Sequence, residues 1–185
     1  MLLFCFGVLL TALFELINEP LTHPPHSITL PMINWVTVYG LWSATTNVFP
    51  PTDVCFTPKT IIVLLVHAIG SMVWFTMLHR LFHTRRLYTL HKVHHTYKHL
   101  SPRAALYAHP VEAIVVNAGS VCAPTAILAD WLCPLARHAV LVVAIIQAVT
   151  AHTDTRAVQN YYHQKHHKLT HTNFGFSVMS NFDRI

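Results

Sequence analysis

The chain has little charge. Charged residues make up only 10% of its 185 positions, and Asp and Glu together number 7, whereas an ordinary soluble domain carries about 25% charged residues. Hydrophobic residues make up 53% of the chain. Because so few charged side chains cannot coat a water-facing surface, a soluble fold is disfavoured. The composition instead predicts a domain that lies largely in a lipid bilayer.

A nucleic-acid-binding motif is absent as well. The formal net charge is +5, but Lys and Arg mostly flank apolar runs and histidine clusters, and no combined aromatic and basic binding motif accompanies them. We therefore expect no nucleic-acid partner. The basic bias is better explained as a membrane-orientation signal.

The cysteines of the chain show no paired spacing. None of its four cysteines has the two-residue gap of a zinc knuckle, and three lie in or beside apolar runs, where a buried cysteine behaves as a small hydrophobic residue. Disulfides are therefore not needed to explain the chain. The four residues are Cys5, Cys55, Cys122 and Cys133.

Long apolar stretches with few charged residues predict an all-α integral membrane bundle of about four spans. Residues 60–78 form the strongest candidate, because all are uncharged and about 20 residues cross the hydrocarbon core. Residues 30–49 form a weaker one. Residues 1–17 lack the basic start and small-residue cleavage site of a signal peptide, so we expect a membrane anchor there. The remaining stretches are residues 111–132 and 135–151.

These last two stretches predict a membrane hairpin with its turn near residues 130–138. One basic cluster follows residues 60–78, and a second follows the hairpin. Because a hairpin crosses the membrane twice, both clusters lie on the same side, and the positive-inside rule assigns that side to the cytosol. All three histidine clusters of the chain fall in these regions. We therefore expect a cytosol-facing, histidine-rich helical metal site.

The histidine clusters contain eight of the 16 histidines. On a helix, residues three and four apart share a face, so each cluster is expected to converge two or three imidazoles on one point. We refer to the clusters as the first, second and third boxes. They comprise His79 and His83; His91, His94 and His95; and His163, His166 and His167.

Eight imidazoles exceed what one ion needs, so the boxes predict a two-metal centre. Neutral imidazole suits iron, copper, zinc and nickel. The lack of nearby cysteine pairs argues against a thiolate zinc site, and the lack of an Asp and Glu array argues against Ca²⁺ or Mg²⁺. The alternative is an exposed histidine tract that picks up metal incidentally. The recurrence of one pattern on one predicted membrane face favours true ligands.

Other candidates lie near the predicted metal face. His152 ends the second hairpin arm and is predicted as a ninth ligand. His109 precedes a proline and could be a ligand, a donor to a ligand, or a helix-start residue. Glu112 and Asp154 could each orient the second nitrogen of a ligating histidine, or could be interfacial charges.

Two further histidines have weaker cases. His171 lies four residues beyond His167, so a continued helix would bring it near the site, although a solvated turn residue is favoured. His67 lies within the strongest predicted span, where a polar group is costly and often functional. The sequence pairs it with no partner.

Several motifs, in order, resemble the fatty acid hydroxylase/sterol desaturase superfamily of membrane di-iron oxygenases. They are the three boxes, Tyr-Ala-His-Pro-Val-Glu at residues 107–112, the isolated His152, Asn-Phe-Gly at 173–175 and Phe-Asp-Arg-Ile at 182–185. The match runs from about Trp74 to Ile185. Within the superfamily, residues 79–112 look most like C-4 methylsterol oxidases, and C-5 sterol desaturases share much of the pattern.

The resemblance implies a multi-pass enzyme of the endoplasmic reticulum with two iron ions per chain. It implies ligand roles for the three boxes and His152, with O2 as co-substrate. The residues themselves indicate no acid or base separate from the metal centre. Electrons would come from NAD(P)H through a separate cytochrome b5 or reductase. Membrane segments and loops would occupy residues 1–59, and the catalytic domain residues 60–185.

The implied reaction is hydroxylation or desaturation of a sterol or related lipid. His152 is followed by Thr-Asp-Thr, where methylsterol oxidases usually have Ser-Gly-Tyr, and this leaves the substrate open. The alternatives are a fatty acid or sphingolipid hydroxylase of the same superfamily, a non-catalytic member, and a non-enzymatic membrane protein that binds or transports metal.

Overall fold

The computed structural model describes residues 28–49, 57–98, 101–153 and 161–170, together with Gly7, Leu9 and Cys55. Over these residues the chain forms helices and no strand, which confirms the predicted all-α class. Apart from Gly7 and Leu9, the predicted anchor at residues 1–17 lies outside the described part. Asp154 and His171 also lie outside it.

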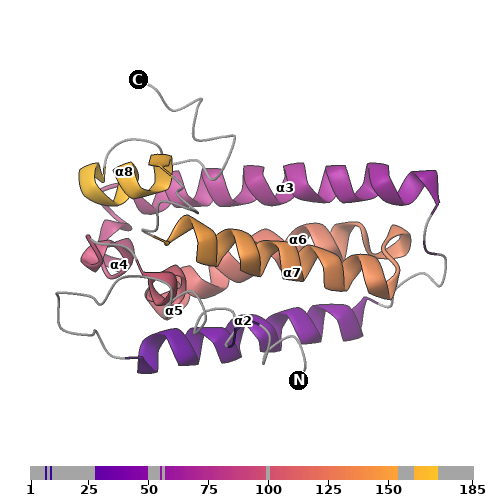
Figure 1. Cartoon of the computed structure of the whole chain (residues 1–185), viewed down its shortest axis with the longest axis horizontal. Helices are drawn as coiled ribbons and strands as arrows, with labels where there is room; N and C mark the ends of the chain where they lie inside the picture. The colour runs from indigo at the N-terminus through magenta and orange to yellow at the C-terminus, as the bar shows by residue number, and fades with distance from the viewer. Residues whose placement is uncertain are drawn as a thin grey trace.

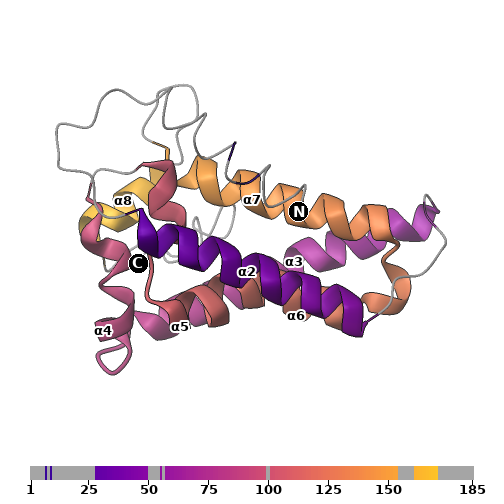
Figure 2. The ribbon, with the colours of Figure 1, turned by 90° about the horizontal axis from the view of Figure 1, so that it is seen from below.

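Long helices run side by side along one direction, with α6 and α7 between α3 and α2 (Figure 1). Seen from below, α2 lies along α6 (Figure 2), which it contacts. The long helices are α2 (Thr29–Val48), α3 (Pro58–Phe82) and α7 (Pro134–Ala151), and α5 (Pro110–Glu112), η3 (Ala113–Ala118) and α6 (Gly119–Ile127) follow one another directly. The shorter elements are α4 (Tyr88–His91), η1 (His94–Thr96), η2 (Pro102–Leu106), η4 (Ala129–Trp131) and α8 (Tyr161–Leu169).

Three helices are long and apolar enough to cross a membrane: Pro58–Phe82, Pro110–Ile127 and Pro134–Ala151. They correspond to the predicted spans at residues 60–78, 111–132 and 135–151. The weaker stretch at residues 30–49 does form a helix, α2, but it is not among the three. Two asparagines and four threonines in α2 dilute its apolar character.

The start of α3 is fixed by local chemistry. Pro58 occupies the first turn, where its missing N–H costs nothing. Thr57 caps the helix, because its hydroxyl accepts from the Thr60 backbone N–H while the Thr60 side chain accepts from the Thr57 backbone N–H. Beyond this cap, Ile61 and Ile62 are more than half exposed, as expected for a helix that faces lipid.

The helices α3 and α6 approach closely. A Cβ atom at Gly119 would lie 2.7 Å from the indole nitrogen of Trp74, so only glycine fits there. That indole N–H donates to the carbonyl of Val115 at 2.9 Å. Val115 belongs to η3, a π-helical turn. The contact holds η3 and α6, which form the first arm of the hairpin, against α3.

The predicted hairpin is confirmed. The first arm ends at Ile127, η4 makes the turn, and Pro134 starts α7. The buried core lies beside this hairpin, where α2, α6 and α7 pack together. Its members are Trp35, Trp42, Leu106, Val121, Leu141, Ile145 and Val149.

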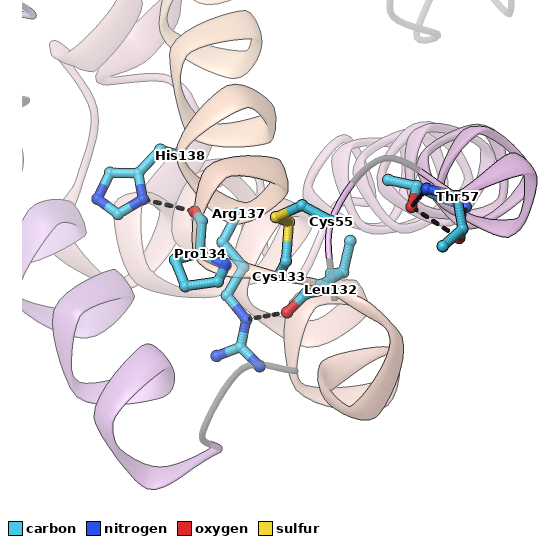
Figure 3. Close-up of a disulfide and its surroundings, with 8 residues drawn as sticks. Cys55, Thr57, Leu132, Cys133, Pro134, Arg137 and His138 are labelled. Carbon is cyan, nitrogen blue, oxygen red and sulfur yellow. Dashed lines mark hydrogen bonds between the residues drawn. A yellow bond between two sulfur atoms is a disulfide. The ribbon is translucent and has the colours of Figure 1, made fainter. Parts of the chain in front are cut away.

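A disulfide joins Cys55 to Cys133 (Figure 3). The expectation that no disulfide was needed is therefore wrong. The two cysteines are separated by 78 residues, and no spacing in the sequence signals the pair, because only the fold brings their Cα atoms to 5.5 Å. The bridge connects the segment before α3 to the hairpin turn.

Arg137 strengthens this same end of the bundle. Its buried guanidinium donates to the carbonyl oxygens of Leu132, Ala129 and Phe49. These carbonyls belong to the hairpin turn and to the end of α2. The disulfide and Arg137 together tie α2, α3 and α7 at the end where α3 begins.

Candidate metal centre

The histidine boxes meet at the opposite end of the bundle, where α3 and α7 end and α4 and α8 lie close by (Figure 1). The first box is at the C-terminus of α3, and the second spans α4 and η1. His152 terminates α7, and α8 carries the third box. All nine predicted ligands are buried, except His83, which is half-buried.

Five of the nine imidazoles form one group, in which the Nε2 atoms follow one another around a closed ring. His91 Nε2 lies 3.0 Å from His79 Nε2 and 2.9 Å from His95 Nε2. His83 Nε2 lies 3.3 Å from His95 Nε2 and 3.1 Å from His166 Nε2. The ring closes between His166 and His79 at 3.2 Å. We call these five residues group 1.

The other four imidazoles form group 2: His94, His152, His163 and His167. His163 Nε2 lies 2.9 Å from His152 Nε2 and 3.2 Å from His167 Nε2, and His152 Nε2 lies 3.3 Å from His94 Nε2. The two groups are adjacent, because the ring centroids of His95 and His167 are 4.8 Å apart. The structure therefore brings all nine predicted residues together.

Each box brings two imidazoles to one group, as expected, but the second and third boxes are each divided between the two groups. Pairs four residues apart stay together, whereas His94 and His166 cross to the other group. Successive residues of a helix are rotated by about 100° about its axis. The residues three and four positions after a given histidine therefore lie on opposite sides of it and can face two different centres. In the second box, α4 also ends at His91 and a 3-10 turn begins at His94.

Hydrogen bonds at Nδ1 fix the tautomers of four rings. Three of these nitrogens donate to backbone carbonyls: His94 to Tyr107 at 3.3 Å, His152 to Ala148 at 2.7 Å and His167 to Tyr97 at 3.1 Å. The fourth, on His91, donates to Glu112 Oε1 at 2.8 Å. Because each Nδ1 carries the proton, each Nε2 presents an unprotonated lone pair to its group.

Burial keeps these rings neutral. It lowers the pKa of His152 to about 4, and burial together with repulsion from His166 lowers the pKa of His83 to about 3. Burial is also the largest cause of the lowered pKa values of His91, His94, His95, His163 and His167, with repulsion from neighbouring histidines next. Neutral imidazole is the form that binds metal.

The donor set fits a pair of metal ions. Neutral His94 and His152 both direct lone pairs at each other, so neither can donate a hydrogen bond to the other, and a cation between them removes the conflict. Two nitrogens each about 2.1 Å from one ion would lie about 3.0 Å apart at a right angle and about 3.4 Å apart at the tetrahedral angle. The observed spacings of 2.9–3.3 Å agree with these values.

Of the other predicted site residues, Glu112 lies where it can orient a ligand. It is 3% exposed, and Oε1 accepts from His91. Oε2 has no hydrogen-bond partner among the described residues. His109 lies outside both groups, at the start of α5, where its Nδ1 accepts from the Val111 backbone N–H at 3.2 Å. This is the helix-start role that the sequence left open.

Sequence reasoning missed the carbonyls that anchor the rings. Those of Tyr97, Tyr107 and Ala148 carry no side-chain signal, and they become recognisable only once the backbone around them is folded. His152 and Ala148 are an exception in principle, since a spacing of four residues at a helix end predicts such a contact.

A cavity of about 330 Å³ opens beneath the histidines. The end of the cavity next to the histidine groups is lined by His79, His94, His152 and Glu112. From there the cavity extends between α3, α6 and α7 toward His67. Most of the wall is apolar, with residues such as Trp35, Leu64, Phe75, Leu141 and Ile145. Cavities of this size hold small organic ligands, so an elongated apolar molecule could lie with one end against the two groups.

Comparison with known proteins agrees with this site. The sequence model of the fatty acid hydroxylase family matches residues 63–185, which include both groups and Glu112. No solved structure matches the chain.

Curated proteins similar to this chain include methylsterol monooxygenases. Methylsterol monooxygenase 1 of Rattus norvegicus is 30% identical over 129 residues, which cover 60% of this chain and 41% of that protein. Methylsterol monooxygenase 1 of Gallus gallus is 42% identical over 62 residues, which cover 31% of this chain and 21% of that protein. C-4 methylsterol oxidase erg25 of Schizosaccharomyces pombe is 46% identical over 52 residues, which cover 28% of this chain and 17% of that protein. In each case the match spans less than half of the relative.

Proposed function

This chain belongs to the fatty acid hydroxylase family, and on that premise we propose that it is a membrane di-iron oxidoreductase that uses O2 to hydroxylate or desaturate a sterol or related lipid. One observation carries the proposal: two adjacent groups of buried imidazoles, four of them with an Nε2 lone pair directed inward, lie at the end of an apolar cavity. This combination provides an oxidising centre and a place for a lipid.

The proposed ligands are the nine histidines, with His79, His83, His91, His95 and His166 for one iron and His94, His152, His163 and His167 for the other. When bound, an iron pair supplies O2 activation and the oxidation of an unactivated C–H bond. Imidazole suits iron, and the family favours iron over zinc, copper or nickel.

The chain's own residues position the ligands and exclude water. Glu112 and the carbonyls of Tyr97, Tyr107 and Ala148 hold four rings in the ligating tautomer. Partners of this kind typically account for a 10- to 100-fold difference in metal affinity. Burial of the rings keeps the centre dry. No separate acid or base is proposed.

The substrate is proposed to resemble a C-4 methylsterol, because the similar proteins are named for that class. A fatty acid or sphingolipid is the alternative within the family, and the apolar cavity would suit either. A metal transporter is disfavoured. It would need ligands inside the spans, and His67, the intramembrane candidate, is bonded to Thr125 and Ser71 instead.

We further propose that the protein lies in the endoplasmic reticulum membrane with its histidine end toward the cytosol. The disulfide at the other end supports this orientation, since disulfides persist in the oxidising lumen. Exposed Arg80, Arg85, Arg86 and Lys92 near the histidines support it too. That end would then receive electrons from NAD(P)H through a separate cytochrome b5 or reductase.

The test is a lipid profile of cells that lack the protein and are complemented with defined variants. We expect deletion to accumulate a 4-methylsterol, wild type and His138→Ala to restore the profile, and His94→Ala and His166→Ala to fail. His138 is the matched control because it is exposed at the far end of α7, away from both groups, where its Nδ1 donates to the Pro134 carbonyl and its ring packs against Trp42. A sterol and fatty-acid profile unchanged by deletion would refute the proposal.

A further inference from the structure

An asparagine lies on the wall of the cavity, in the first arm of the hairpin. Asn117 belongs to η3, is half-buried, and lines the cavity together with Glu112 and Ser120. Its backbone carbonyl accepts from the Ser120 hydroxyl at 2.7 Å. Its side-chain amide makes no hydrogen bond among the described residues. The amide therefore has both donor and acceptor capacity to offer to the cavity.

A structural role would leave a different contact. An asparagine inside a membrane protein commonly hydrogen-bonds to a neighbouring helix. Asn34 of α2 shows how such a residue is satisfied inside this bundle, because its side-chain nitrogen donates to the carbonyls of Leu106 and Ala108 at 2.8 and 2.9 Å. Within the described part of the chain, Asn117 has no equivalent bond. An amide left without a partner in an apolar span is costly, and a ligand oxygen would use it.

The backbone around Asn117 is irregular. Residues 113–118 are π-helical, whereas α5 before them and α6 after them are α-helical. Short π-helical stretches inside α-helices are rare and frequently lie at functional sites. Asn117 lies within this stretch, and its side chain lines the cavity where α6 begins.

Asn117 lies toward the histidine end of the cavity. It follows Glu112, which accepts from the group 1 residue His91, by five positions, so the two are no more than about 8 Å apart along the helix axis. At the other end of the cavity, both ring nitrogens of His67 are already engaged by hydroxyls. A lipid whose oxygen lies close to its oxidised carbon would therefore place that oxygen at Asn117 and its hydrocarbon toward His67.

We propose that the Asn117 amide binds the lipid hydroxyl that neighbours the oxidised carbon, and so determines which carbon faces the metal centre. This rests on the proposed function, namely that a C-4 methylsterol or a similarly hydroxylated lipid occupies the cavity. In such a sterol, the carbon that carries the hydroxyl is bonded directly to the carbon that carries the methyl group. A hydrogen bond to the hydroxyl therefore also fixes the position of the methyl group. The amide matches a hydroxyl because it can both donate to it and accept from it.

The test compares two ligands that differ only in this hydroxyl: 4,4-dimethylcholestan-3β-ol and 4,4-dimethylcholestane. The dissociation constant of each is measured with the full chain in lipid nanodiscs, for wild type, Asn117→Leu, Asn117→Ala and Asn47→Leu. Leucine has about the size of asparagine without the amide, and alanine is the residue most compatible with a helix. Asn47→Leu is the matched control, because Asn47 is exposed near the end of α2 and does not line the cavity.

We expect the preference for the hydroxylated ligand to be about five- to tenfold greater in wild type and Asn47→Leu than in either Asn117 variant. Because the preference is compared between variants, any difference in how the two ligands partition into the bilayer cancels. The same preference in all four proteins would overturn the proposal. Gln147 of α7 is the competing amide, since it is exposed and also lines the cavity. A preference lost in Gln147→Leu but kept in the Asn117 variants would overturn the proposal as well.

Iron content, measured on the same samples, separates this proposal from the proposed function. Asn117 belongs to neither histidine group, so we expect its variants to contain as much iron as wild type. A wild-type protein that binds neither ligand would contradict sterol oxidation and the role of Asn117 together. A wild-type protein that holds iron and binds both ligands, with a preference that Asn117→Leu leaves unchanged, would contradict the role of Asn117 alone.

Discussion

The Nε2 atoms of His94 and His152 face each other at 3.3 Å, although each ring already donates its Nδ1 proton to a backbone carbonyl. Two neutral rings in this state cannot share a hydrogen bond. Protonation is not the remedy, because burial holds the pKa of His94 well below its ordinary value and that of His152 at about 4. A metal cation between the two nitrogens would remove this conflict.

The iron content of a variant should depend on which groups its substitutions disrupt, and not on which boxes they disrupt. His94→Ala combined with His163→Ala changes two boxes but only group 2, so we expect the protein to retain about one iron per chain. If each box served one ion, the same substitutions would damage two sites. The measurement is elemental analysis of protein purified in detergent.

The matched comparison is His94→Ala combined with His95→Ala. These neighbours belong to one box but to different groups. We therefore expect this variant to contain less iron than the variant that combines His94→Ala with His163→Ala. Equal iron contents in the two double variants would contradict the assignment of ligands.

Glu112→Gln should weaken iron binding by about 10- to 100-fold. The amide keeps the shape of the side chain but loses the carboxylate that accepts from His91 Nδ1 at 2.8 Å, so the ring is less firmly held as a ligand. Competition with a chelator measures the affinity. Asp130→Asn, a change of the same kind in η4 at the far end, should leave it unchanged. Equal affinities in Glu112→Gln and wild type would remove the positioning role of Glu112.

The metal-free protein should lose stability as the pH falls below about 6.5. An unfolded histidine is protonated below that value, whereas folded His152 stays neutral down to a pKa of about 4. Because the unfolded state binds more protons in this window, stability is full above pH 6.5 and is lost as pH falls toward 4. The loss from His152 alone is about 3 kcal/mol.

Thermal unfolding of chelator-treated protein in detergent measures this effect. His152→Gln removes one titrating group, so its unfolding temperature should depend less steeply on pH between 6.5 and 4. A pH dependence as steep as that of wild type would show that His152 does not contribute.

The two ends of the bundle should face different compartments. In sealed microsomes, with Cys5 and Cys122 replaced by alanine, a cysteine placed at exposed Lys92 should react with a membrane-impermeant maleimide. Cys55 and Cys133 should react only after reduction and permeabilisation, because they are joined in a disulfide at the other end. Labelling of Cys55 and Cys133 in sealed, reduced microsomes would reverse the orientation.

The positions of the helices and of the nine histidines could be predicted from the sequence because both are local signals. An uncharged run marks a span, and Pro134 after the turn marks the start of α7. His-x-x-His-His places its first and last rings on one face of a helix. The convergence of the boxes followed from counting membrane crossings, which needs no side-chain geometry.

What could not be predicted depends on contacts between distant segments. The disulfide of Cys55 with Cys133 spans 78 residues, and the partnership of His67 with Thr125 spans 58. The division of His94 from His95 depends on the break between α4 and η1, where the backbone changes from an α turn to a 3-10 turn. Patterns of residue spacing carry no information on such packing.

The central claim is that nine histidines hold two iron ions, and the metal content of the wild-type protein tests it most directly. The full chain, expressed with iron and purified in detergent without added metal, should contain about two irons per chain and little zinc, as should His138→Ala. A wild-type protein that contains no metal, or zinc in place of iron, would contradict the account.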